Sequence, residues 1–259
     1  ADVPTDVIQY GPLSGHMGIA YLDGKNPSLI YSAKNRRPDK GFEMMVMAYS
    51  MEGSQMKLAW KYIRDHRGGS DGHNIRIADV DGDGIDEVIP WGYALNSQGK
   101  LKWILGDNAV HGDRFFIGKM DPKRPGLQGY AIQQDQPEYM YWLYYDARDG
   151  KVIHKQYGNS LADLARGMVG DFDPRHEGFE MWTFVDNLYN VQSGKGTANA
   201  MPSGAYPNLR IWWDGSLLSQ NLDGLKFTKW DYQNSSLSRI YTAPWQVAAV
   251  LDRVVPSFY

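Results

Sequence analysis

The feature that most limits the fold of this 259-residue chain is a repeated unit of two apolar segments joined by an acidic turn. In each copy, an apolar segment leads into an Asp followed by Gly or Pro, and a second apolar segment follows the turn. The copies contain Asp23, Asp81, Asp121 and Asp173, which are 58, 40 and 52 residues apart. Such periods are typical of architectures that stack one supersecondary unit after another.

A second strand–turn–strand unit follows each of these units. We place its copies at residues 48–60, 94–103, 144–154 and 211–218. Two hairpins per repeat give four strands in ~40–50 residues, which is the size of a propeller blade. The sequence therefore predicts an all-β protein, a β-propeller of four-stranded blades, with room for about five to six blades.

The composition agrees with this class and excludes several others. The chain has 28 Gly and 13 Pro for turns, and 17 Tyr and 9 Trp for packing or for contacts with sugars. A formal charge of −3 argues against nucleic acid and anionic membranes as partners. With no Cys there is neither a disulfide framework nor a thiol nucleophile. We expect a monomer with no nucleic-acid or membrane partner.

An acidic loop at residues 79–87 is the sharpest local motif. Carboxylates at alternating positions around a Gly turn gather hard oxygens in a small volume, as Ca²⁺ requires. Pro90 stands where an EF-hand would have its twelfth-position Glu, and the flanks resemble strands. We predict a structural calcium site on a β-hairpin, with a solvated acidic turn as the alternative. The expected ligands are Asp79, Asp81, Asp83, Asp86 and Glu87.

Three further positions occupy comparable entry points of successive blades. His73, beside Asn74, precedes the second repeat, and His111 with Asp113 precedes the third. Arg166 takes the same kind of place before the fourth, where its guanidinium would suit a carboxylate. The alternative reading is ordinary hydrogen-bonded histidines and a structural salt bridge. We assign Asn74 and Asp113 to substrate binding.

A compact basic cluster lies in an earlier turn. Lys34, Arg36 and Arg37 are candidates for binding a carboxylate or sulfate of a carbohydrate, and a solvated loop is the alternative. No phosphate-binding loop is present, so nucleotide binding finds no support.

Taken in order along the chain, these motifs resemble the propeller polysaccharide lyases, above all rhamnogalacturonan lyase family 11. The resemblance implies a β-propeller with bound Ca²⁺ and β-elimination next to a uronic acid. It also places His73, His111 and Arg166 around the cleft of that family. The motifs that carry it are Gly18–Gly24 with Pro27–Ile30, His73–Asn74, Ala78–Gly84 with Asp86–Ile89, His111–Asp113, Asp121–Pro122, Arg124–Leu127, Arg166–Met168, Asp173–Arg175 with Glu180–Trp182, Trp212–Gly215 and Lys229–Asp231.

The chain also resembles the ulvan lyases in one spacing, with Tyr21 sixteen residues before Arg37. Two segments, after Ile30 and after Trp230, depart from the pattern of the rhamnogalacturonan lyases. Ulvan and rhamnogalacturonan I are therefore nearly tied as substrates, with ulvan slightly favoured.

The resemblance implies roles for five residues. Arg37 and Arg166 would neutralise the uronate carboxylate, while Tyr21, His73 and His111 would carry protons. The rival function is a non-catalytic, calcium-binding and carbohydrate-binding propeller. A glycoside hydrolase is a third reading, for which Asp113 and Asp171 could supply the two carboxylates.

The ends of the sequence carry no start or stop signal. Ala1 is preceded by neither Met nor a signal peptide, and the apolar run 254–259 ends without a turn. We expect residues 1–259 to be part of a single β-propeller catalytic domain truncated at both ends. The complete propeller would have seven or eight blades, in a secreted or periplasmic protein.

Overall fold

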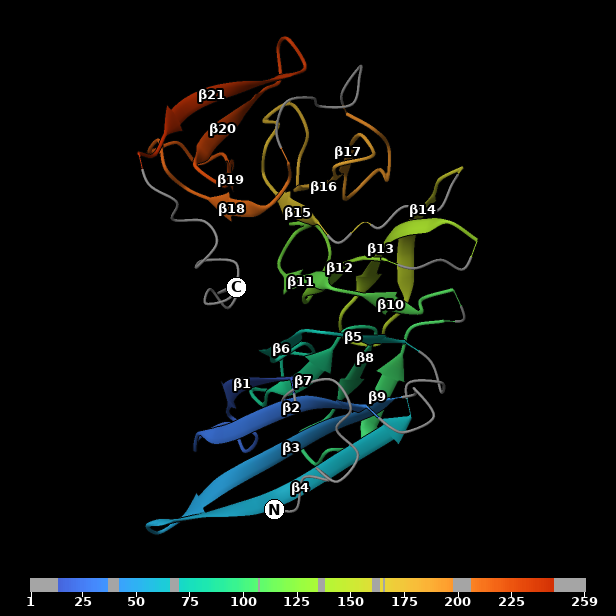
Figure 1. Ribbon diagram of the computed structural model, residues 1–259, viewed down its shortest axis with the longest axis vertical. Coiled ribbons are helices and arrows are strands. Elements are labelled where there is room, and N and C mark those ends of the chain that lie inside the picture. The colour runs from blue at the N-terminus through green and yellow to red at the C-terminus, as the bar shows by residue number, and fades with distance from the viewer. Residues whose placement is uncertain are drawn as a thin grey trace.

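The computed structural model describes residues 14–36, 42–65, 70–106, 108–134, 138–159, 164, 166–197 and 206–244. Every regular element in these ranges is a β-strand, and none of the ranges contains a helix (Figure 1). In particular, this part of the chain has no helix that is long and apolar enough to span a membrane. The predicted all-β class is confirmed.

Five antiparallel sheets follow one another along the described chain, each built from strands that are consecutive in sequence. The first sheet contains β1 (Ser14–Ala20), β2 (Ser28–Arg36), β3 (Phe42–Glu52) and β4 (Gln55–Asp65). The second contains β6 (Ile75–Ala78), β7 (Glu87–Pro90), β8 (Tyr93–Leu95) and β9 (Leu101–Ile104). The third contains β11 (Arg114–Gly118), β12 (Gln128–Ile132), β13 (Met140–Asp146) and β14 (Val152–Tyr157). The fourth contains β15 (Gly167–Gly170), β16 (Glu180–Thr183) and β17 (Leu188–Asn190), and the fifth contains β18 (Leu209–Ile211), β19 (Gln220–Asp223), β20 (Lys226–Asp231) and β21 (Ser236–Thr242).

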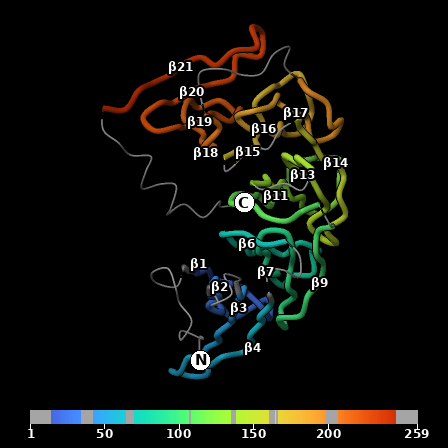
Figure 2. Tube along the Cα trace, turned by 45° about the vertical axis from the view of Figure 1, so that its right-hand side comes forward, coloured from blue at the N-terminus to red at the C-terminus, as the bar shows by residue number. Residues whose placement is uncertain are grey.

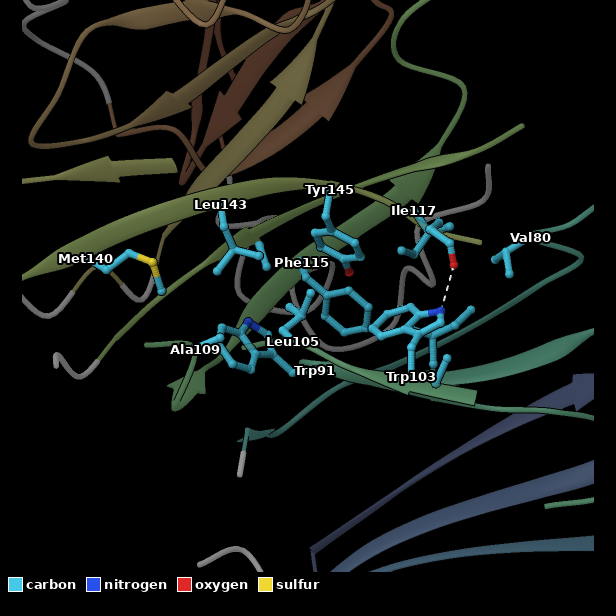
Figure 3. Packing of buried hydrophobic residues seen from close by; sticks show 14 residues of the cluster. Val80, Trp91, Trp103, Leu105, Ala109, Phe115, Ile117, Met140, Leu143 and Tyr145 are labelled. Carbon is cyan, nitrogen blue, oxygen red and sulfur yellow. Dashed lines mark hydrogen bonds between the residues drawn. The ribbon is translucent and has the colours of Figure 1, made fainter. Parts of the chain in front are cut away.

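The hydrophobic core lies between consecutive sheets. Trp91 and Trp103 of the second sheet pack against Phe115 and Tyr145 of the third (Figure 3). The indole N–H of Trp103 donates to the carbonyl of Ala147 at 3.0 Å and joins these two sheets. Comparable clusters fill the spaces between the other neighbouring sheets. Each sheet therefore buries its apolar faces only when its neighbours are present.

The turn between the first and second strands recurs from sheet to sheet. The four aspartates predicted to be equivalent, Asp23, Asp81, Asp121 and Asp173, all lie in this turn. In the fourth sheet, Glu180 Oε2 accepts the N–H groups of Phe172 at 2.9 Å and Asp173 at 3.0 Å. The residues that begin the second strand and accept turn N–H groups in this way are Glu87, Gln128, Glu180 and Gln220.

One predicted hairpin is wrong. Residues 211–218 were expected to be the second hairpin of the fourth repeat, but Ile211 ends β18, the first strand of the fifth sheet. Asp214 then takes the turn position, where its Oδ1 accepts the N–H of Ser216 at 3.0 Å. The second hairpin of the fourth sheet instead starts with β17, and Tyr189 pairs with Gly196 across its turn. Both hairpins of a repeat have a strand, a polar turn with Gly and a strand, so local sequence does not distinguish them.

The first strands of the five sheets lie beside one another in chain order, and β6, β11, β15 and β18 can be followed in Figure 2. Contacts at both ends show that β1 and β6 run in the same direction. The His16 ring, near the start of β1, lies within hydrogen-bonding reach of the backbone of His73, just before β6. Beyond the ends of the strands, the N–H of Tyr21 donates to Asp86 Oδ2 at 2.7 Å. The segments that enter the first strands therefore gather at one end of the sheets.

Candidate functional site

Two short parallel strands bring the predicted histidine segments together. β5 (Asp71–Gly72) pairs with β10 (His111–Gly112), with Asp71 opposite His111 and Gly72 opposite Gly112. A Cβ on Gly72 would lie 2.3 Å from the Cβ of Trp91, and one on Gly112 would lie 2.2 Å from the carbonyl oxygen of Ile132. Only glycine fits this close approach, because such distances are shorter than any real contact of a Cβ atom.

Asp71 orients His111. Its Oδ1 forms a short hydrogen bond with His111 Nδ1, and its Oδ2 lies 3.4 Å from Lys34 Nζ. Burial alone would raise the pKa of Asp71, but the hydrogen bond to His111 and the charge of Lys34 outweigh burial and hold that pKa below its usual value. An ionised carboxylate only accepts hydrogen bonds, so Nδ1 of His111 carries the proton and Nε2 is left as the acceptor.

His73 and Asp113 complete the histidine cluster, which we define as His73, His111 and Asp113. Asp113 Oδ1 lies 3.5 Å from His73 Nε2 and 3.9 Å from His111 Nε2. The two imidazole rings meet edge to face with centroids 5.1 Å apart. Burial and the charge of Lys34 lower the pKa of His73, although Asp113 opposes the shift. His73 is therefore neutral near pH 7, the form that accepts a proton or binds a metal.

The histidine cluster could also hold a cation. One ligand atom from each of its three residues lies within 4.8 Å of the others. Asp113 Oδ1 is buried and accepts no hydrogen bond from the residues that the structure describes. A donor set of two imidazole nitrogens and one carboxylate oxygen is suitable for a divalent metal.

Arg166 lies at the entry of β15, as predicted, and its guanidinium binds a side-chain amide. Its Nη1 donates to Asn208 Oδ1 at 3.0 Å. Arg114, the residue after Asp113, donates to the same oxygen at 3.1 Å. Thus the entry of the fourth sheet is linked through Asn208 to the segment that carries the histidine cluster.

The other predicted binding residues take different places. Asn74 uses its side-chain N–H to bind the backbone carbonyl of Asp113, which fixes the entry of β11. Lys34 belongs to the site through Asp71, and Arg36 is the last residue of β2. Arg37 lies outside the described residues. Tyr21 is 48% exposed and lies past the end of β1, beside the acidic loop, so the structure does not place it with the histidines.

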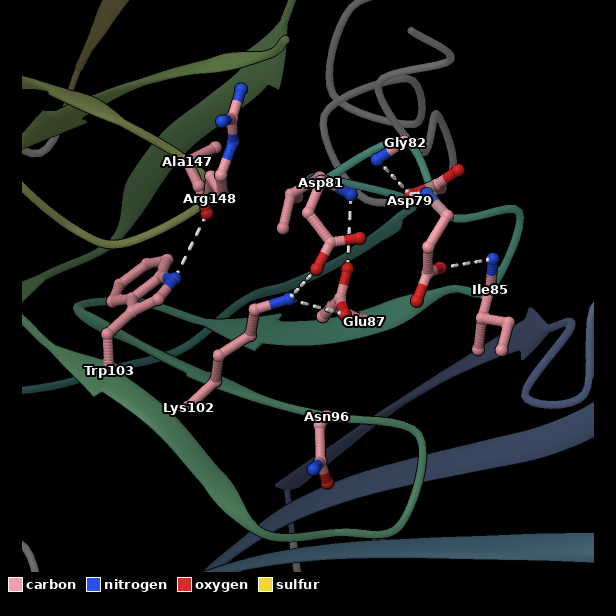
Figure 4. Close-up of polar contacts among 12 residues, drawn as sticks. Asp79, Asp81, Gly82, Ile85, Glu87, Asn96, Lys102, Trp103, Ala147 and Arg148 are labelled. Carbon is pink, nitrogen blue, oxygen red and sulfur yellow. Dashed lines mark hydrogen bonds and ion pairs between the residues drawn. The ribbon is translucent and has the colours of Figure 1, made fainter.

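The acidic loop brings three of its five predicted ligands together (Figure 4). Asp79 Oδ1 accepts the N–H of Gly82 at 2.7 Å, and its Oδ2 accepts the N–H of Gly84 at 2.8 Å. Asp81 and Glu87 both bind the ammonium of Lys102. The three clustered carboxylates are Asp79, Asp81 and Glu87.

The two remaining carboxylates of this loop serve the backbone. Asp83 Oδ1 accepts the N–H of Ile85 at 2.8 Å, and Asp86 Oδ2 binds the turn of the first sheet through Tyr21. Lys102 already supplies one positive charge to the clustered carboxylates. A metal ion at this loop would therefore compete with an ammonium group.

Sequence reasoning missed Asp71, Arg114 and Asn208. A signal for Asp71 exists, because Asp71-Gly72-His73 and His111-Gly112-Asp113 are the same three residue types in reverse order. A central Gly in both segments is what two closely paired strands require. Asn208 gives only a positional signal, since it directly precedes the first strand of its sheet as Asn74 and Asp113 do.

Comparison with protein families gives one match over almost the whole chain. Residues 15–257 match the model described as "Rhamnogalacturonan lyase family 11, C-terminal domain". The rhamnogalacturonan endolyase YesW of Bacillus subtilis is 36% identical over 247 residues, which are 93% of this chain and 37% of that protein. The rhamnogalacturonan exolyase YesX of the same species is 29% identical over 255 residues, 91% of this chain and 39% of that protein.

Solved structures agree with these matches. The crystal structure of YesW superposes with a TM-score of 0.76 at 36% identity, over 89% of this chain and 38% of the other. A Bacillus licheniformis rhamnogalacturonan lyase superposes with a TM-score of 0.73 at 35% identity, over 88% of this chain and 38% of the other. The chain thus spans a little over a third of the length of these relatives.

Proposed function

The chain belongs to rhamnogalacturonan lyase family 11, as its motifs suggested, and on that premise we propose that it carries the active site of a polysaccharide lyase. The proposed reaction is β-elimination at a rhamnose–uronic acid linkage of rhamnogalacturonan I. The observation that carries the proposal is the histidine cluster, oriented by Asp71 where the first strands begin.

The choice of rhamnogalacturonan over ulvan has two supports. The matched relatives are named rhamnogalacturonan lyases. An ulvan lyase would need Tyr21 as a proton carrier. Tyr21, however, lies beside the acidic loop and not in the histidine cluster.

β-Elimination requires a base, a proton donor and a positive charge at the uronate carboxylate. The C5–H and C4–O bonds break as a C4=C5 double bond forms, and the departing oxygen takes up a proton from solvent. We assign the C5 proton to Nε2 of His111, because Asp71 holds the opposite nitrogen of that ring. Arg166 is assigned to the carboxylate, whose charge must be stabilised for C5 to lose its proton.

As an alternative to His111 acting as the base, the residues of the histidine cluster fit a divalent cation, because an ion bound to Nε2 of His111 would take the lone pair that accepts the proton. One ligand atom of each residue lies within 4.8 Å of the others, and the buried Oδ1 of Asp113 could coordinate the ion. Such an ion would add positive charge at the uronate carboxylate.

We further propose that the five sheets are consecutive blades of a β-propeller to which residues 1–259 belong. Two features support this. The sheets repeat one strand order, and their first strands lie side by side in sequence order. In a propeller the first strands surround the central axis. Because the proposed substrate is a large extracellular polymer, we also propose a secreted or periplasmic enzyme.

The test is an assay of the full-length protein that contains this chain. Rhamnogalacturonan I should yield products with the ultraviolet absorbance of an unsaturated uronate, whereas ulvan should not. A protein that binds the polymer without any rise in absorbance would instead be the non-catalytic carbohydrate-binding propeller. Rapid absorbance increase on ulvan alone would reverse the choice of substrate.

A calcium ion is proposed for the acidic loop, in competition with Lys102. Lys102→Met removes the ammonium that Asp81 and Glu87 share, so these carboxylates repel each other until another cation binds. We expect the variant to melt several degrees below wild type with a chelator and to recover in excess calcium. Saturation at about 100 times Kd corresponds to ~2.7 kcal/mol of stabilisation.

Lys100→Met is the matched control, because Lys100 is an exposed lysine in the nearby β8–β9 turn. Its melting temperature should not depend on calcium more than that of the wild type. If calcium leaves the melting temperature of Lys102→Met unchanged, the loop is only an acidic turn neutralised by lysine.

A further inference from the structure

We propose that Asn208 is a positioning residue that aligns Arg114 and Arg166 as a clamp for the carboxylate of an acidic sugar. The proposal rests on the lyase function proposed above. It adds to that site a second guanidinium and the neutral group that holds both.

Three consecutive sheets meet at one amide oxygen. Arg114 is the first residue of β11, Arg166 directly precedes β15, and Asn208 directly precedes β18. Nη1 of Arg114 donates to Asn208 Oδ1 at 3.1 Å and also to the Asn208 carbonyl. Nη1 of Arg166 donates to the same Oδ1 at 3.0 Å. One amide therefore brings together two guanidinium groups that lie 52 residues apart in the sequence.

The amide of Asn208 is fixed from its other side. Its Nδ2 donates to Asp223 Oδ1 at 3.2 Å, and its backbone N–H donates to Asn221 Oδ1 at 3.1 Å. Asn221 is held in turn through the carbonyl of Tyr206 at 2.9 Å. Since a carboxylate accepts hydrogen bonds only from Nδ2, the oxygen of the Asn208 amide has to face the arginines. Asn208 is only 9% exposed, so the orientation is built in before a ligand binds.

A neutral group at this position has a specific consequence. An aspartate of the same shape would accept the same hydrogen bonds, but its charge would compete with a substrate carboxylate for both arginines. Asparagine holds the guanidinium groups without adding a negative charge. Their planar donor pairs match the geometry of a carboxylate.

The clamp adjoins the histidine cluster in the chain. Arg114 directly follows Asp113, which lies at the bend between β10 and β11. Asp113 contacts the histidines, and Arg114 contacts Asn208. A uronate bound between them would have its carboxylate at the arginines and its ring carbons near the imidazoles.

The test exchanges the partners of one hydrogen bond in the full-length protein. The double variant Asn208→Asp/Asp223→Asn keeps the acceptor for both arginines and restores the bond to position 223 with donor and acceptor reversed. A purely structural role would be rescued by this exchange. The clamp would not, because the exchange places a carboxylate against both arginines without changing the net charge of the protein.

Affinity is measured for a rhamnose–galacturonate disaccharide with the uronate at its non-reducing end, which has no linkage at O4 to cleave. Its carboxyl-reduced form is the neutral probe. We expect the wild type to prefer the acidic form. The double variant should bind the acidic form about 10- to 100-fold more weakly, the range for a hydrogen bond to a charged group. Its affinity for the neutral form should be unchanged.

Two further variants complete the design. Asn96→Asp, in the turn between β8 and β9, introduces the same side-chain change at a position where the acceptor oxygen is retained. It should leave the affinities for both probes unchanged.

Arg114→Gln should weaken binding of the acidic form alone, and it tests the clamp independently of how the double variant folds. Wild-type affinity in a folded double variant, or unchanged acidic binding in Arg114→Gln, would overturn the clamp while the lyase assay still stands. A wild type without preference for the acidic form would overturn the clamp and the proposed substrate together.

Discussion

If the full-length protein is the proposed lyase, Asp71→Asn is expected to lower kcat by about 10²–10⁴-fold with little change in KM. The carboxylate of Asp71 accepts the Nδ1–H of His111 and thereby leaves Nε2 as the proton acceptor. An amide at position 71 can offer the ring either its oxygen or its N–H, so the required tautomer is no longer enforced. The measurement is the initial rate on rhamnogalacturonan I as a function of substrate concentration and pH.

Asp121→Asn is the matched control for this change. Asp121 is also a buried aspartate, but it lies in the turn of the third sheet and binds Lys123 and Gln192. Its replacement should affect stability more than kcat. A variant Asp71→Asn with kcat within a factor of a few of wild type would remove His111 from the proposed role as the base.

Glu180→Gln is expected to make the stability of the protein less dependent on pH, and to raise it above that of the wild type in alkaline solution. Burial raises the pKa of Glu180 from 4.5 to about 8. Its side chain is fully inaccessible, and Oε1 finds no hydrogen-bond partner among the described residues. The equivalent residues of the third and fifth sheets, Gln128 and Gln220, are neutral amides.

The direction in which stability changes with pH follows from how tightly Glu180 binds its proton in the folded and unfolded states. Glu180 binds its proton more tightly in the folded state, so stability is full below pH 4.5 and is lost as the pH rises to about 8. One pKa unit is worth ~1.4 kcal/mol, so Glu180 accounts for a loss of ~1.4 kcal/mol between about pH 7 and 9. Burial lowers the pKa values of His16 and His73 below their usual value, so these two histidines stay neutral across this window.

Urea unfolding between about pH 5 and 9 measures this difference between wild type and variant. Glu177→Gln serves as the control, since Glu177 is half exposed and pairs with Lys123 at the surface. It removes the same charge but should leave the pH profile of the wild type intact. Parallel profiles for wild type and Glu180→Gln would show that Glu180 ionises normally in the folded protein.

The order of apolar and polar residues within short segments was sufficient to predict the strands and the turns that begin each repeat. Asp121 and Asp173 could be predicted as turn residues because a carboxylate that accepts nearby backbone N–H groups stabilises a turn wherever the chain lies. The same reasoning misassigned Trp212–Gly215, because the first and second hairpins satisfy the same short-range rules. Only pairing with β19 decided which sheet that segment joins.

The sequence by itself determined the residue types of the proposed site, through the entry positions of His73, His111 and Arg166. What the tertiary structure decided is which groups they meet. Asp71 faces His111 across forty residues because β5 and β10 pair in parallel, and Arg166 meets Asn208 because the first strands of neighbouring sheets lie side by side. Hydrophobic pattern and turn chemistry act over a few residues and can be read along the chain. The partners of a charged side chain depend on how whole sheets pack, since hydrogen bonds of about 3 Å form only after distant segments have been brought into contact.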